Sequence, residues 1–251
     1  MKQWMQCMLI VWATVLATGT ARGANVQSLA LPGQDAAPIY CADGLERILP
    51  GDYYGCRALY HLQREHYREA ISMLKESAYW ANKEAQHQLG LVYINGDMPG
   101  VSTNLPLGIA WLALARERHQ PEYERDYALA IARSTAAQQT QAAAIYLELR
   151  KRYGDAVAGK RATRRFNHEI AGIDEAANGG VAWISGFGPF PARAYTLSHQ
   201  LHAEAESAFG GLQGSVLVGP LQRVQDRMDT ALLPARGSNA ASPPPPKAGD
   251  H

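Results

Sequence analysis

Histidine and acidic side chains are the first candidates for chemistry in this chain, because they bind metal ions and transfer protons. His168 begins a His-Glu pair like that of the H-E-x-x-H zinc motif, but residue 172 is glycine, so the second histidine is missing. His199 and His202 are three residues apart in an expected helix, with Glu206 one turn further on, a spacing that would allow a metal ion at the surface. Helical histidine pairs without a third converging ligand are more often solvated. We therefore predict no metal site.

Other common catalytic motifs are missing from the sequence. It contains no G-x-S-x-G, no P-loop and no C-x-x-C. The run Gly186-Phe187-Gly188-Pro189 looks like a phosphate-binding loop, but it lacks a third glycine, and its proline has no amide hydrogen to donate. We therefore predict no cofactor, no catalytic residues and no enzymatic activity.

The composition describes an ordinary globular protein. The 251 residues are 47% hydrophobic and 19% charged, with a formal net charge of +1. Collagens, coiled-coil rods, polytopic membrane proteins and wholly disordered chains each need a more biased composition. A dedicated nucleic-acid binder would carry a strong basic excess, so no nucleic-acid partner is expected.

Residues 1–23 have the pattern of a secretory signal peptide. Lys2 precedes an apolar run over 7–17, which is too short to span a bilayer as a helix, and small residues follow it. Cleavage is expected after Gly23, with cleavage after Ala21 nearly as good and an uncleaved anchor as the alternative. The mature chain would then be periplasmic or secreted, without a transmembrane span. It would hold 22 basic and 23 acidic residues, a net charge of −1.

Two cysteines, Cys41 and Cys56, remain after signal cleavage. In an exported protein an even pair is most simply a disulfide, which here would fasten an extended segment at 24–54 to the first helix. Two separately buried thiols are the alternative.

The middle of the chain repeats itself. Apolar residues over 67–78 and 107–115 recur every three or four positions, as on a helix with one buried face. Four pairs are offset by 40 residues: Tyr67 and Leu107, Ala70 and Ala110, Ile71 and Trp111, and Leu74 and Leu114. Such a period predicts stacked helical hairpins.

A second helix of the hairpin is expected from about Lys83. Ala85, Leu89 and Tyr93 share one face, and Gly90 would allow another helix to approach closely. Gly96 suits the left-handed position that ends a helix. Further helices are expected at 56–66, 123–133 and 135–153, the last opened by a capping box, which gives about three hairpins over 55–153.

These hairpins are similar to the Sel-one-like repeat family, bacterial relatives of tetratricopeptide repeats. The match consists of Ala85, Leu89, Gly90, Tyr93, Gly96, Val101, Ala110, Trp111, Leu114 and Ala115. It departs from the family pattern at Met98-Pro99 and at 116–118. The resemblance implies an α-solenoid that binds a protein partner on its concave face. The residues expected to make contact there are Gln86, His87, Gln88 and Asn95, with Tyr79 and Trp80 at a helix end.

The region after the repeats carries weaker signals. Between Arg150 and Arg165 the chain has seven basic residues and one acidic residue, and a basic amphipathic helix is expected at 154–178. Its basic face would either contact an acidic partner or an anionic surface weakly, or simply be solvated. A small strand-helix-strand unit is expected at 179–233, with strands near 181–184 and 215–218. A disordered proline-rich tail follows at 234–251.

The sequence thus predicts a mainly α protein, an α-solenoid followed by a small α/β unit. Its expected function is that of an exported scaffold or adaptor for an unknown protein in the cell envelope. Two alternatives stay open. One is an envelope enzyme like the cysteine-rich repeat proteins associated with penicillin binding or β-lactam hydrolysis, although those carry a cysteine pair in each repeat. The other is a structural envelope protein held by the basic helix.

Overall fold

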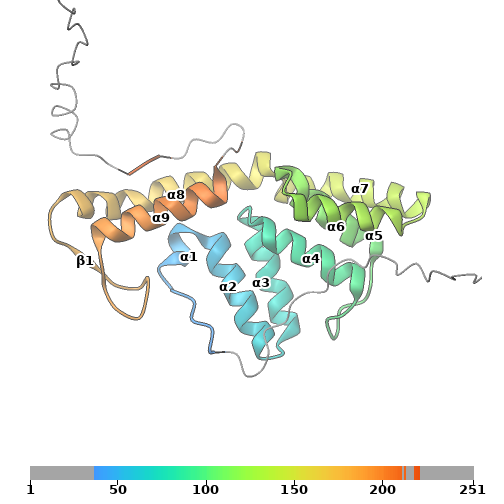
Figure 1. Ribbon diagram of the computed structural model, residues 1–251, viewed down its shortest axis with the longest axis horizontal. Helices are drawn as coiled ribbons and strands as arrows, with labels where there is room; N and C mark the ends of the chain where they lie inside the picture. Colours follow the sequence, from blue (N-terminus) through green and yellow to red (C-terminus); the bar gives the residue numbers. More distant parts are fainter. Residues whose placement is uncertain (1–36, 211, 213–217, 221–251) are drawn as a thin grey trace, which may run out of the picture.

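The computed structural model describes residues 37–210, 212 and 218–220 (Figure 1). The signal peptide at 1–23, residues 24–36 of the predicted extended segment, most of the second strand candidate and the tail at 234–251 lie outside these residues.

The described chain is mainly helical, as predicted. The helices are α1 (Leu45–Ile48), α2 (Pro50–Gln63), α3 (Tyr67–Tyr79), α4 (Lys83–Asn95), α5 (Leu105–Ala115), the 3-10 helix η1 (Arg116–Arg118), α6 (Pro121–Ala132), α7 (Ala136–Tyr153), α8 (Asp155–Asn178) and α9 (Ala194–Phe209). Two short strands, β1 (Trp183–Ile184) and β2 (Ala192–Arg193), precede α9. Among the helices described, none is both long and apolar enough to cross a membrane.

Local sequence explains where several helices begin and end. The Asn82 side chain accepts a hydrogen bond from the Ala85 amide at 2.9 Å and so caps the start of α4. Thr135 and Gln138 form the predicted capping box at the start of α7. Gly96 has a φ of 63°, the left-handed conformation expected of it at the end of α4.

Helices α2 to α5 pack on one another in chain order, and α7 covers α5 (Figure 1). Their shared core contains Leu62, Leu74, Leu89, Trp111 and Leu114, all buried. Burial of such side chains supplies the main stabilising free energy of each helix pair. Residues predicted to lie on the repeating apolar faces therefore do form the core.

A second core lies between α1, α8 and α9, and Figure 1 shows α8 and α9 side by side. Phe166, Ile170, Leu201 and Phe209 are buried within it. The predicted apolar face of the 154–178 helix is therefore confirmed.

Two boundaries differ from the predictions. The segment predicted as extended at 24–54 contains α1 and the first turn of α2, because Pro50 occupies the start of α2, where its missing amide hydrogen costs nothing. The strand predicted near 181–184 is present as β1, but a second strand before α9 was not predicted. β1 pairs antiparallel with this strand, β2, with Trp183 opposite Arg193. Of the strand candidate at 215–218, only Val218 is described, and it is not in a strand.

The predicted disulfide between Cys41 and Cys56 is present, with the two Cα atoms 5.7 Å apart. It fastens the segment before α1 to the middle of α2.

Candidate functional site

The polar residues predicted to contact a partner are largely internal. Gln86 has no exposed surface, and its amide nitrogen donates to the Tyr153 carbonyl oxygen at 2.9 Å. His87 is also buried, against Asp126. The prediction that these two side chains are exposed is therefore wrong, because helices far along the chain cover this face of α4. Gln88 and Asn95 are half-buried.

The two aromatic residues at the end of α3 also make internal contacts. The Arg161 guanidinium lies 3.4 Å from the centre of the Tyr79 ring and donates to the Tyr79 carbonyl oxygen. Trp80 packs against the core formed with α8 and α9. Both side chains are half-buried and join the repeats to the region that follows them.

The residues of the repeat pattern have structural roles. Ala85, Leu89, Ala110 and Trp111 are buried, and Tyr93 packs against the same core. A Cβ atom on Gly90 would lie 2.6 Å from a Leu112 methyl group, so glycine permits the close approach of α4 and α5, as expected.

The histidine pair on α9 does not form a metal site. His202 is buried and its Nε2 lies 3.0 Å from Asp174 on α8, whereas His199 stacks on Tyr195. The interpretation of His202 as a surface residue is therefore wrong. His168 lies 3.3 Å from its neighbour Glu169.

The glycine-containing loop between β1 and β2 closes the second core. The Gly186 carbonyl oxygen accepts from the Gly44 amide at 2.9 Å, and Phe187 packs against the core beside it.

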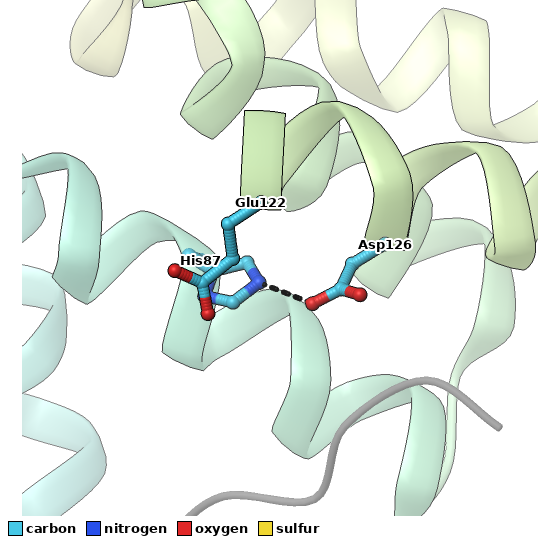
Figure 2. Close-up of side chains that lie close together, drawn as sticks. All are labelled: His87, Glu122 and Asp126. Atoms are coloured by element: carbon cyan, nitrogen blue, oxygen red, sulfur yellow. Dashed lines mark hydrogen bonds and ion pairs between the residues drawn. The ribbon is translucent and has the colours of Figure 1, made fainter. Parts of the chain in front are cut away.

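The structure brings together a group of side chains that the sequence did not indicate. His87 on α4 meets Glu122 and Asp126 on α6, and both acidic side chains point from α6 toward the imidazole ring (Figure 2). The Nε2 atom of His87 lies 2.9 Å from Oδ2 of Asp126. His87 and Asp126 are buried, and Glu122 is exposed.

A groove with a volume of about 1000 Å³ lies between α5, α6 and α7. Ile109 of α5, Ile131 of α6 and Ala142 of α7 contribute apolar surface to it. Arg116 and Arg150 lie at its exposed edge.

An ion-pair network supplies part of the lining of this groove, through Glu117, Arg118 and Asp155. Lys83 is only 5% exposed, and its ammonium group lies 3.1 Å from Glu117 and 2.7 Å from Asp155. It also donates to the Leu114 carbonyl oxygen at 2.7 Å. Arg118 pairs with Asp155 at 3.3 Å. The acidic groups that line the groove are therefore neutralised from within the protein.

The tyrosines beside these sites are held in the neutral form. Burial, followed by the charge of Glu117, raises the pKa of Tyr146 above its usual value of 10.0. Burial and the neighbouring Glu84 raise the pKa of Tyr123 in the same direction. Both phenols are therefore hydrogen-bond donors at neutral pH, Tyr146 to Glu117 and Tyr123 to Glu84.

The basic stretch between Arg150 and Arg165 is partly used inside the molecule. Arg165 donates to the Arg47 carbonyl oxygen at 2.7 Å and faces Glu169 at 3.6 Å. Arg161 donates to the Tyr79 carbonyl oxygen in the same way. Both residues therefore make internal contacts, which reduces the number of basic side chains available to bind an anionic surface.

No protein-family model matches this chain, and no curated protein or solved structure matches it. Membership of the Sel-one-like repeat family therefore remains a prediction from the repeat residues.

Proposed function

We propose that this protein is an exported helical-repeat adaptor that binds a protein partner in the groove between α5, α6 and α7. The proposal keeps the adaptor function implied by the family resemblance and moves the binding surface away from Gln86 and His87, which are buried. Export is supported by the Cys41–Cys56 disulfide, because such bridges persist mainly in oxidising compartments such as the periplasm and the cell exterior.

The main observation behind the proposal is that other helices cover α7 only in part. Ala142 is the one buried residue of this 18-residue helix, and Ala143, which lines the groove beside it, is exposed. Small apolar residues beside a groove leave room for an entering helix. The groove volume is at the upper end of the range for small-molecule pockets, about 300–1000 Å³, so it accommodates the side chains of a peptide segment.

Charge identifies the kind of partner. Lys83 and Arg118 pair with Glu117 and Asp155 inside the protein. The cations at the edge of the groove are Arg116 and Arg150, which make only longer contacts with acids, 3.4 Å to Glu124 and 3.6 Å to Glu117. The side chain of Arg150 is 56% exposed. An amphipathic helix with an apolar stripe flanked by aspartate or glutamate is complementary to this edge.

Site-specific photocrosslinking in living cells tests the proposal. A photoreactive residue is placed at Ala143 in the groove, or at Ala171, an exposed alanine on α8 that does not line it. We expect a partner crosslink from position 143 only, with the crosslinked peptide belonging to an acidic amphipathic helix. Ala143→Glu should abolish this crosslink when the probe is moved to Gln139, and Ala171→Glu should not. Equal crosslinking from 143 and 171, or none from 143, would overturn the proposal.

A further inference from the structure

His87, Glu122 and Asp126 have the ligand types and the arrangement of a metal site. One donor atom from each lies within 4.8 Å of the donor atoms of the other two. Glu122 and Asp126 are four residues apart on α6, so both project from one face, and His87 approaches from α4 (Figure 2). Imidazole and carboxylate groups are the donors that zinc takes in sites with three protein ligands and one open position.

Two of the three donors are already oriented. Asp126 has no exposed surface. Its Oδ1 accepts from the Arg125 guanidinium at 3.1 Å, which leaves Oδ2 directed at His87. The Tyr123 ring packs on the imidazole with the ring centres 4.7 Å apart. Contacts of this kind fix the direction of metal ligands in known sites.

Glu122 supplies the adjustable third donor. Its side chain is exposed and makes no hydrogen bond or ion pair within the described part of the chain. Zinc holds oxygen and nitrogen donors at about 2.0–2.2 Å, which places two donors of a tetrahedral site about 3.3–3.6 Å apart. On metal binding the 2.9 Å contact between His87 Nε2 and Asp126 Oδ2 therefore widens by about 0.5 Å, and the imidazole nitrogen gives up any proton that it holds. The Glu122 side chain is free to rotate toward the ion.

The local charge also favours a cation. Glu84 lies beside the group, where it accepts a hydrogen bond from the Tyr123 hydroxyl at 3.2 Å. Two carboxylates, those of Glu122 and Asp126, therefore face His87, and a third, that of Glu84, lies at the Tyr123 side chain that packs on the imidazole. Within the described residues, Arg125 is the cation that pairs with these acids, through Asp126. A divalent ion would neutralise this excess of negative charge.

We propose that His87, Glu122 and Asp126 bind one divalent transition-metal ion of the zinc type, which links α6 to α4. The site is independent of the groove proposed above, since none of its three ligands lines that groove. It differs from the histidine pair considered from the sequence, because its donors come from two helices, with His87 and Asp126 39 residues apart.

Zinc titration of the full chain, without a histidine tag and after removal of metal by a chelator, tests this site. We expect one zinc ion per chain by isothermal calorimetry. Glu122→Gln should weaken binding at least tenfold while leaving the melting temperature of the metal-free protein unchanged, because Glu122 is exposed and unpaired. Zinc should raise the melting temperature of the unaltered protein and have little effect on that of the variant.

His119 provides the matched control, because it is a neighbouring surface histidine that faces Glu124 at 3.0 Å. His119→Ala should leave zinc affinity unchanged. The absorption spectrum of the cobalt-loaded protein gives a second measurement, and His87→Asn should alter or remove it. Absence of zinc binding, equal binding in Glu122→Gln, or loss of binding in His119→Ala would overturn the proposal.

Discussion

At the scale of single residues, Ser198, His202 and Asp174 have the composition of a catalytic triad but not its order of contacts. Ser198 donates to Asp174 at 2.6 Å, and His202 approaches the same carboxylate at 3.0 Å. In a serine hydrolase the histidine lies between the serine and the acid, so that it can remove the hydroxyl proton. Here both groups meet the acid, and all three are buried. Their geometry therefore serves to join α9 to α8.

Replacement of Asp174 tests this structural role. Asp174→Ala leaves Ser198 and His202 buried without their acceptor, and we expect a loss of about 3 kcal/mol in the free energy of unfolding measured with urea. Glu175→Ala, at the next position of α8 but exposed, should change it by less than about 0.5 kcal/mol. Equal losses in the two variants would contradict the assignment.

Asp52 on α2 predicts a pH dependence of stability. Burial, followed by the charge of Glu204, raises its pKa from 3.8 to about 6, and the Asn82 hydrogen bond offsets only part of this rise. The folded state therefore favours the protonated acid. This contribution to stability is fully present below about pH 4 and is lost as the pH rises through 6.

Asp52→Asn should remove that loss, because the amide stays neutral and still accepts from Asn82. We expect the free energy of unfolding of the variant, relative to that of the unaltered protein, to rise by about 1–2 kcal/mol between pH 4.5 and pH 7.5. Urea unfolding at the two pH values measures this, and the figure allows for the partial exposure of Asp52. Asp43→Asn, at an exposed position before α1, is the control and should show no such gain. A parallel pH profile for Asp52→Asn and the unaltered protein would refute the assignment.

At the scale of elements, the crossing of α4 and α5 depends on glycine. A Cβ atom on Gly108 would lie 2.8 Å from the carbonyl oxygen of Gly90 and 2.5 Å from a side-chain carbon of Ile94. A backbone oxygen cannot move aside without shifting the helix. Gly108→Ala should therefore lower the free energy of unfolding by about 2–3 kcal/mol.

Gly172→Ala on α8 should instead raise the free energy of unfolding. Nothing lies within 4 Å of a Cβ atom at that position, so alanine brings only its higher helix propensity, about 0.5–1 kcal/mol. Thermal melts of both variants measure the comparison, and a stabilised Gly108→Ala would disprove close packing at this crossing.

Most elements could be predicted from the sequence because their signals are local. The spacing of Ile71 and Leu74, the Thr135 capping box and the glycine at 96 each act within one or two turns. The burial of Gln86 could not be predicted in this way, because its partner Tyr153 is 67 residues away. The group formed by His87, Glu122 and Asp126 could not be predicted for the same reason, because His87 and Asp126 are 39 residues apart. Only the spacing of four between the two acids was visible in the sequence.

At the scale of the whole molecule, two of the hydrophobic cores are joined by polar contacts. The first core contains Leu74 and Leu89, and the other contains Phe166 and Leu201. Between them, Lys83 at the start of α4 reaches Asp155 at the start of α8. Arg118 extends the connection, because its guanidinium donates to the carbonyl oxygens of Ala81 and Ala208, the latter in α9. The ion-pair network therefore connects α4 and η1 to the start of α8 and the end of α9.

Removal of the central cation tests this coupling. Lys83→Met keeps the length of the side chain but removes the buried ammonium group from Glu117 and Asp155, which retain only the guanidinium groups of Arg150 and Arg118. We therefore expect a loss of about 2–3 kcal/mol in the free energy of unfolding. Lys151→Met removes only an exposed pair with Glu148 and should cost less than about 1 kcal/mol.

Hydrogen exchange measured by mass spectrometry distinguishes loss of coupling between the two cores from a general loss of stability. In the unaltered protein the slowest amides of α4 and of α8 should exchange through one common unfolding step. In Lys83→Met, the amides of α8 and α9 should exchange in a separate and earlier unfolding step, because the ion pair between Lys83 and Asp155, which joins α4 to α8, is lost. A uniform acceleration across both cores would show that Lys83 stabilises the fold without coupling its two parts.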